Sequence, residues 1–463
     1  MGNDSFDPLS STSSPVIVYL DIKSPYAFIA RAPTRALEAE LGLRFDWRPL
    51  TLNIPSYLGS AKLDKRGKVE TARRSRSQWG AVKYAYRDAR RYAALQGYPL
   101  RGTEKIWDTA LIHIAFNWVR TTAPEALDAF LDRVYPPFWQ RDLDIEDLAL
   151  VTQTLRAADV ETAGFAAYAT GVGREQHDIE QTAIFDAGIY GVPTYVHGGE
   201  FWFGRENLAV LRHRLLGNPG PAPDVRYDRL SGRDVETPTL AAQLKPVERI
   251  DIYIDLLEAP SYLGLAATVA MLDTTGRQAR WLPFRGPAPT ARPNESEATA
   301  DSTVRGVAHR RHRSRYRVAS LEAQAAALGC SIERRYSPTS AALFDDALLW
   351  VDDQPDAPAV EPFIAACFNA YWEHNADITD ADMIRTELIA AGFDGNAWAA
   401  RLRDGQLDTA AVARIDAALA NAEERGTWEG PRFILDDEPY SGRTHLPLVE
   451  ARLRLVQSET PTQ

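Results

Sequence analysis

The sequence predicts an α/β protein made of two tandem copies of one domain, each with a sheet and an inserted helical subdomain. Similar motifs recur in the same order at a nearly constant spacing, and a Pro- and Gly-rich segment separates the two series. The predicted parts are a disordered tail over 1–15, a first domain over 16–217, a linker over 218–247, a second domain over 248–456 and a tail over 457–463.

The internal similarity is clearest near the end of each copy. Residues 191–208 align without a gap on residues 429–446, which pairs Pro193 with Pro431 at a spacing of 238. Upstream, Trp139 pairs with Trp372 at a spacing of 233. Two further matches join residues 91–97 to 323–329 and residues 17–21 to 250–255. Four matches in one order indicate a duplication.

Each element of the first copy has a local signal. Residues 16–20 are β-branched and aromatic, as expected of a buried strand. Ser24-Pro25 provides an N-cap and a first-turn proline, and the helix that follows ends at Gly42. The remaining expected elements are a strand over 43–47, helices from about 70 to 163, a hairpin turning at 198–199 and a closing helix over 208–216. This order is typical of a thioredoxin-like sheet with a helical insert.

Composition excludes several classes of protein. The net charge of −11 argues against nucleic acid as the main partner, and no apolar run is long enough for a membrane span. The two cysteines, Cys330 and Cys367, form no CxxC motif, which argues against a thiol–disulfide centre. The polar N-terminus lacks the pattern of a secretory signal, so we expect a cytoplasmic protein.

Ser24-Pro25-Tyr26 directly follows the first strand and offers a seat for an anion. The unpaired N–H groups and positive dipole end of a helix suit a thiolate, to which Ser24 Oγ can donate a hydrogen bond. The alternative is an ordinary N-cap serine without a ligand.

Two later segments belong to the same hypothesis. Val192-Pro193 before a strand suggests a cis peptide bond, which would let the Val192 backbone pair with a peptide ligand; a simple turn is the alternative. Gly204 and Glu206 precede the last helix and are candidates to bind the charged end of a zwitterion, or else they form a capping turn.

Basic residues concentrate in two places. Residues 62–91 contain eleven Lys or Arg and three acidic residues, which suggests either anion steering or a solvated helix face. Residues 305–317 contain six Arg together with His309 and His312. The HxxH spacing permits a metal site, but no third ligand is apparent and none is predicted.

These motifs resemble the glutathione-dependent branch of the DsbA-like family, namely 2-hydroxychromene-2-carboxylate isomerase and kappa-class glutathione transferase. The resemblance covers residues 16–217 and is carried by Ser24-Pro25-Tyr26, Trp47-Arg48-Pro49, residues 87–93, residues 191–194 and residues 203–208. It implies that glutathione is the cofactor and that Ser24, in place of a redox cysteine, holds its sulfur as the catalytic residue. It also implies a glutathione- or substrate-binding set of Pro25, Tyr26, Asn53, Val192, Pro193, Gly204, Glu206 and Asn207.

The sequence departs from that family at several positions. Glu206-Asn207 stands where the family usually has Asp-Arg, and the family's lysine aligns with Ala81, near Lys83. The second copy has Glu258-Ala259-Pro260 in place of Ser24-Pro25. A carboxylate there would repel a thiolate, so the second copy is predicted to be degenerate.

The predicted function is glutathione-dependent isomerisation of an unsaturated aromatic small molecule by reversible thiol addition. The alternatives are a kappa-type transferase, which would stop after addition, and a non-catalytic thioredoxin-like binding module. Because members of this family pair as homodimers, we expect either an intrachain pseudo-dimer or a homodimer.

Overall fold

The computed structural model describes residues 6–11, 13–63, 69–73, 76–220, 222, 246–286, 304–333, 340–354, 358–426 and 429–455. The C-terminal tail over 457–463 lies outside the described residues, as do most of the predicted linker and residues 287–303. The predicted N-terminal tail is described over 6–11 and 13–15.

Contacts divide the chain into two compact units. The first unit comprises residues 1–218, 228–235 and 295–314, and the second comprises residues 219–227, 236–294 and 315–463. The segment 304–314 therefore belongs by its contacts to the first unit, although it comes late in the chain. No helix of the described part is long and apolar enough to cross a membrane.

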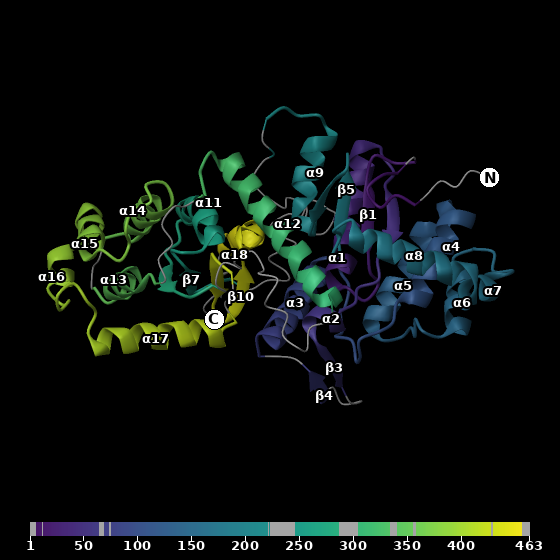
Figure 1. Cartoon of the computed structure of the whole chain (residues 1–463), viewed down its shortest axis with the longest axis horizontal. Helices are drawn as coiled ribbons and strands as arrows, with labels where there is room; N and C mark the ends of the chain where they lie inside the picture. The colour runs from purple at the N-terminus through teal and green to yellow at the C-terminus, as the bar shows by residue number, and fades with distance from the viewer. Residues whose placement is uncertain are drawn as a thin grey trace, which may run out of the picture. The chain divides into compact units, whose positions relative to one another are not determined.

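The first unit is built on a four-stranded mixed sheet in the order β2-β1-β5-β6. Strand β1 runs parallel to β2 and antiparallel to β5, and β5 is antiparallel to β6. Its elements are β1 (Ile17–Leu20), α1 (Pro25–Leu41), β2 (Asp46–Pro49), α2 (Pro55–Leu58), β3 (Ser60–Leu63), β4 (Val69–Arg73), α3 (Arg76–Leu95), α4 (Ala110–Thr122), η1 (Pro124–Ala126), α5 (Leu127–Gln140), α6 (Leu148–Ala157), α7 (Phe165–Thr170), α8 (Val172–Asp186), β5 (Thr194–His197), β6 (Glu200–Phe203), η2 (Arg205–Asn207) and α9 (Leu208–Leu215). The block α3–α8 is inserted in the sequence between the strands β1–β2 and the strands β5–β6. Helices α4–α8 lie beside the sheet, to the right of β1 in Figure 1.

The signals at both ends of α1 are confirmed. Ser24 has extended backbone angles, and its Oγ accepts a hydrogen bond from Ala27 N at 3.2 Å. Gly42 ends the helix with φ of +63°, a left-handed conformation in which glycine avoids the steric penalty of a Cβ. Strand β1 ahead of the helix is completely buried. The strand, the cap and the helix therefore place Ser24 at the carboxyl end of a central strand.

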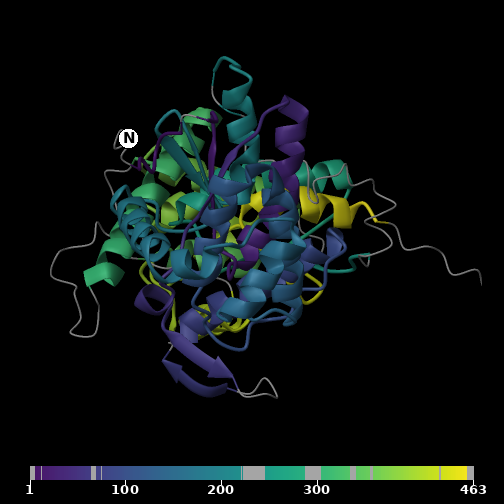
Figure 2. The same ribbon diagram turned by 90° about the vertical axis from the view of Figure 1, so that its right-hand side faces the viewer.

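Two predicted elements have different bounds. The second strand covers Asp46–Pro49 instead of 43–47, because pairing starts where Asp46 N donates to Val16 O at 2.8 Å. The helical block begins at Arg76 instead of about 70, because β3 and β4 form an antiparallel hairpin first. Figures 1 and 2 show this hairpin extending away from the sheet. Val69 and Thr71 are β-branched residues at alternating positions, which favours a strand.

The helical insert is anchored by aromatic rings. Phe28 of α1 lies parallel to Tyr135 of α5, with ring centroids 5.6 Å apart, and 6.3 Å from the ring of Trp139. All three side chains are buried. Each such pair adds roughly 0.5–1.5 kcal/mol beyond area burial, so the contact holds the insert next to the start of α1.

The second unit has its own four-stranded mixed sheet, in the order β10-β9-β7-β8. The pairing directions match those of the first sheet, because β7 is parallel to β8 and antiparallel to β9, which is antiparallel to β10. The elements assigned wholly to this unit are β7 (Ile250–Ile254), α11 (Ala259–Thr275), β8 (Arg280–Pro283), α13 (Ala342–Asp352), α14 (Glu361–Trp372), α15 (Ala381–Ala390), α16 (Gly395–Ala399), α17 (Thr409–Glu424), β9 (Arg432–Leu435), β10 (Glu438–Ser441), η4 (Arg443–His445) and α18 (Leu446–Leu453). Helix α12 (Val304–Leu328) begins in the first unit's segment and ends in the second unit.

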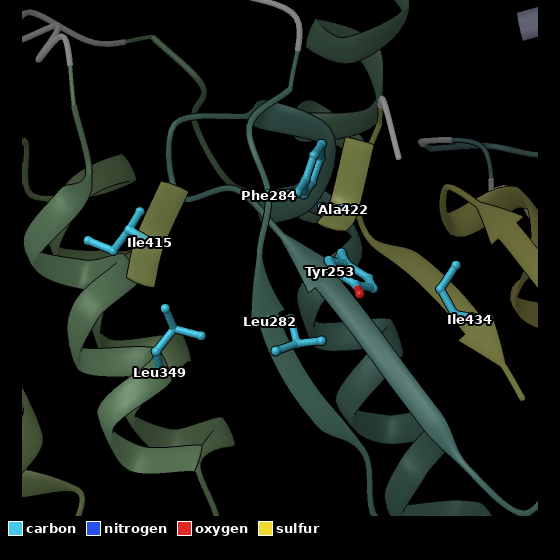
Figure 3. Packing of buried hydrophobic residues seen from close by; sticks show 7 residues of the cluster. All are labelled: Tyr253, Leu282, Phe284, Leu349, Ile415, Ala422 and Ile434. Carbon is cyan, nitrogen blue, oxygen red and sulfur yellow. The ribbon is translucent and has the colours of Figure 1, made fainter. Parts of the chain in front are cut away.

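The core of the second unit joins its sheet to α13 and α17. Tyr253, Leu282 and Ile434 project from three strands, and Leu349 and Ile415 project from the two helices (Figure 3). Phe284 and Ala422 complete this buried cluster. The second sheet is therefore covered by a helical layer of its own.

Candidate active site

A cavity of about 880 Å³ opens in the first unit at the start of α1. Ser24, Pro25 and Tyr26 line it together with Gly191 and Val192, from the turn before β5. The structure thus brings together four of the predicted site residues, from segments that are far apart in the sequence. The volume lies within the usual range for small-molecule sites.

Ser24 presents donors to this cavity. The residue is 6% exposed, and because its Oγ accepts from Ala27 N, its hydroxyl proton is left to donate. No described residue accepts a hydrogen bond from Tyr26 N–H at the first turn of α1. Burial, followed by the charge of Asp88, raises the pKa of the Tyr26 phenol well above its ordinary value. The start of α1 therefore offers a hydroxyl and a backbone donor at the positive end of a helix.

The predicted cis peptide bond between Val192 and Pro193 is confirmed. Thr194 Oγ1 donates to Gly191 O at 2.8 Å, and Gly204 N donates to Pro193 O at 2.9 Å. Within the described part of the chain, the backbone N–H and C=O of Val192 form no hydrogen bond. Val192 thus offers a free donor and a free acceptor at the cavity wall.

The other predicted site residues do not line this cavity. Asn53 lies beside a smaller hollow, where its carbonyl accepts from Ser56 Oγ at 2.7 Å. Asn207 Nδ2 donates to Phe203 O at 2.7 Å, which closes the turn after β6. Pro193 precedes β5, Gly204 follows β6, and Glu206 lies in η2. Their roles in binding remain predictions.

Lys23 is a cavity-lining residue that sequence reasoning missed. Its Nζ donates to Trp107 O at 3.1 Å and lies 3.8 Å from Asp21 Oδ2. Burial of Asp21 would by itself raise the pKa of its carboxyl, but the charges of Lys23 and His113 and hydrogen bonds to the carboxylate together lower that pKa to about 2. The first half of the sequence contains no pattern that distinguishes Lys23 from a surface lysine. The structure identifies Lys23 as a cation held next to Ser24.

A buried polar chain continues behind Asp21. His113 Nε2 lies 3.4 Å from Asp21 Oδ1, and Thr51 Oγ1 lies 2.7 Å from His113 Nδ1 and 3.1 Å from His177 Nε2. Burial, followed by the charge of His113, lowers the pKa of His177 to about 4, so its imidazole is neutral at pH 7. This chain fixes the loop between β2 and α2 against the helical insert.

The side chains that line the cavity are mostly basic or aromatic. Its basic side chains are Lys23, Lys83, Arg87, Arg90, Lys105, Arg141 and Arg313, and Glu104 is the acidic residue among the described lining residues. Its aromatic side chains are Tyr26, Tyr57, Trp79, Tyr86, Trp107, Tyr190, Phe203 and His309. Part of the basic stretch predicted over 62–91 thus lies at the cavity; the side chains of 62–70 and 72–77 lie outside the described set. The excess of positive charge favours an anionic ligand.

The equivalent position in the second unit is filled by the protein itself. Glu258 Oε2 accepts from Ser261 Oγ at 3.0 Å and from Gly430 N at 2.7 Å, beside the cis peptide bond that precedes Pro431. Burial, followed by the charge of Glu429, raises the pKa of Glu258 well above its ordinary value. This carboxyl group joins the start of α11 to the turn before β9.

The two histidines of the HxxH pattern contact aromatic rings. His309 stacks on Tyr57 with ring centroids 3.8 Å apart, and His312 lies 5.1 Å from the Phe185 ring. Within the described residues, no three His, Cys, Asp or Glu side chains cluster in a way that could hold a metal ion.

Comparisons with known proteins found similarity in the first half of the chain. A family described as the DSBA-like thioredoxin domain matches residues 15–216. A 2-hydroxychromene-2-carboxylate isomerase from Pseudomonas putida is 25% identical over 203 residues, which cover 42% of this chain and 92% of the relative.

Two solved structures are also similar. A 2-hydroxychromene-2-carboxylate isomerase is 20% identical, with a TM-score of 0.35, over 44% of this chain and 94% of its own. A probable DsbA oxidoreductase from Streptomyces coelicolor is 17% identical, with a TM-score of 0.35, over 45% of this chain and 92% of its own. On the family match, residues 15–216 have a DsbA-like thioredoxin fold. A second four-stranded mixed sheet lies in a separate region of the chain.

Proposed function

We propose that the first unit is a glutathione-dependent isomerase acting on an unsaturated aromatic substrate. The observation that carries this proposal is the meeting of Ser24, the start of α1 and the free Val192 backbone at one cavity. The relative's name supports the substrate class, and Ser24 in place of a cysteine favours a thiol supplied by a small molecule. Glutathione itself remains part of the proposal.

The proposed reaction begins with the glutathione thiolate held by Ser24 Oγ and Tyr26 N–H. The thiolate adds to the β-carbon of a double bond conjugated to a carbonyl, and the electron pair moves to the carbonyl oxygen as an enolate. The former carbon–carbon double bond is now a single bond, and the molecule rotates about it. The enolate then re-forms the double bond and expels the thiolate, so the product is an isomer and glutathione is regenerated.

Lys23 supports this chemistry as a nearby counter-charge. Its ammonium lines the same cavity, and the protein holds it with Asp21 and Trp107 O. A cation that the protein holds in place stabilises a developing thiolate or enolate without the reorganisation that water would need. A transferase would use the same residues and stop after protonating the adduct.

A non-catalytic binding module is the second candidate, and it is favoured for the second unit alone. In that unit the Glu258 carboxyl group lies at the start of α11, the position that corresponds to the proposed thiolate site of the first unit. The matching strand orders and the repeated motifs support our proposal that the second unit arose by tandem duplication and lost this site. On this view the two units take the place of the two subunits of a homodimer. Light scattering of the chain in solution should then give a single particle of the chain mass, 51.4 kDa.

The enzymatic proposal is tested with 2-hydroxychromene-2-carboxylate as the probe. We expect isomerisation, followed by ultraviolet absorbance or NMR, that requires glutathione and is lost in Ser24→Ala. Turnover without glutathione would contradict the proposed role of the thiol. Glutathione binding without turnover of this probe would leave a transferase or a binding module as the function of the first unit.

A further inference from the structure

The segment 304–314 supplies part of the cavity wall, although it follows β8 in the chain. Its anchor is His309, which is 6% exposed and stacks on Tyr57 with an interplanar angle of 4°. Because the Tyr190 carbonyl can only accept, His309 Nε2 donates to it at 3.1 Å. The imidazole is therefore held by a ring on one side and a carbonyl at its edge.

Two further contacts fix the same face of the helix. The Arg305 guanidinium lies 4.2 Å from the centre of the Phe185 ring, and His312 meets the edge of that ring at 5.1 Å. Residues spaced three and four apart share one face of a helix. Arg313 follows His309 by four residues and therefore lies on the same face of the helix. It is one of the residues that line the cavity.

Among the described residues, the charge of Arg313 has no ion-pair partner. No described residue forms an ion pair or hydrogen bond with its guanidinium, and the same holds for Lys83 and Arg87 of α3, which also line the cavity. Other basic groups there are already engaged, since Lys105 pairs with Glu146 at 2.5 Å and Arg141 pairs with Glu104 at 3.3 Å.

We infer that Arg313, positioned by His309, binds the acidic group of a flat aromatic ligand and selects anionic over neutral ligands at this cavity. Guanidinium groups bind carboxylates and sulfonates through paired hydrogen bonds, and the neighbouring aromatic side chains provide an apolar surface for the ring. This assignment names the substrate class of the proposed function, and its catalytic meaning rests on that function. The acidic group would be held by a segment from the later half of the chain.

The test uses two fluorescent probes with one aromatic skeleton. 1-Anilinonaphthalene-8-sulfonate carries an anionic group, and N-phenyl-1-naphthylamine lacks it. We expect Arg313→Gln in the full chain to weaken binding of the sulfonate about tenfold, the loss of one charge-assisted contact, and to leave binding of the neutral probe unchanged. Arg313→Lys should restore part of the affinity.

The matched control is Arg310→Gln, on the same helix at an exposed position outside the cavity wall. We expect both probes to bind this variant as they bind the native chain. Equal weakening of both probes in Arg313→Gln, or an unchanged affinity for the sulfonate, would overturn the assignment. Glutathione binding is measured separately, so its absence would contradict the proposed function without altering the result with the probes.

Discussion

At the scale of single residues, Ser24 has two roles that substitutions can separate. It caps α1 through Ala27 N, and it faces the cavity. Ser24→Ala removes both functions, so we predict a loss of about 1 kcal/mol in stability and a glutathione thiol pKa about one unit higher. Denaturant unfolding measures the first effect, and the ultraviolet absorbance of the thiolate measures the second.

Ser24→Asp separates the two roles. Aspartate caps helices as well as serine does, so stability should be nearly retained, while its carboxylate should repel the thiolate and abolish the thiolate absorbance. Ser56→Ala serves as the control, because Ser56 lies outside the cavity wall. Thiolate absorbance that persists in Ser24→Asp would show that the anion does not lie at this helix start.

Asp21 should make the first unit sensitive to acid. Its pKa is lowered from 3.8 to about 2 in the folded state, so its stabilising effect is present above about pH 4 and is lost as the pH falls through 2. The shift corresponds to about 2 kcal/mol, which Asp21→Asn should remove at pH 7.

Denaturant unfolding at several pH values measures this effect. The difference in stability between Asp21→Asn and the native chain should approach zero below pH 2. Asp178→Asn provides the control, because its exposed pair with Arg174 contributes little. An Asp21→Asn variant as stable as the native chain at pH 7 would contradict the interpretation.

At the scale of elements, two glycines in helical regions should respond oppositely to alanine. Gly42 ends α1 at φ of +63°, so Gly42→Ala should cost about 1 kcal/mol. Gly80 lies inside α3, where an added Cβ would meet no atom within 4 Å, so Gly80→Ala should stabilise by up to about 1 kcal/mol. Thermal unfolding of the two variants distinguishes them, and shifts of the same sign would contradict this account of the two helices.

The start of α11 should be sensitive to base. The folded-state pKa of Glu258 is raised above 4.5, so the unfolded chain loses its proton first and the second unit loses stability as the pH rises above 4.5. Glu258→Gln removes this penalty and should stabilise the unit at pH 8, with no gain at pH 4.

Thermal melts at both pH values test this prediction. Glu423→Gln is a matched control at an exposed position of α17, and it should show no such dependence on pH. A gain for Glu258→Gln that is equal at pH 4 and pH 8 would mean that ionisation of Glu258 is not the cause.

The elements differ in how far the sequence could predict them. Strand β1, the cap at Ser24, the end of α1 at Gly42 and the turn at Gly198-Gly199 were predictable, because each depends on local residue chemistry. The β3–β4 hairpin was not predicted, because the charged residues among its few β-branched residues hide the alternation that is typical of a strand. A helix pattern based on spacing continues through such a segment without a visible break.

At the scale of the whole molecule, long-range contacts set the limit of prediction. Nothing near Lys23 in the sequence indicates that Trp107 O and Asp21 hold its ammonium at the cavity. The HxxH spacing of His309 and His312 does not indicate their contacts with the Tyr57 and Phe185 rings of the first unit. Ser24 and Val192 were found from local motifs, and only the fold shows that they share one cavity.

We propose above that the start of α1 stabilises a thiolate supplied by glutathione. The most direct test is a pH titration of the ultraviolet absorbance of glutathione bound to the full chain. A helix N-terminus together with one hydrogen bond to the charged sulfur should lower the thiol pKa by roughly one to two units, and the thiolate would then be present near neutral pH. A bound thiol that titrates like free glutathione, or a failure to bind, would contradict the account.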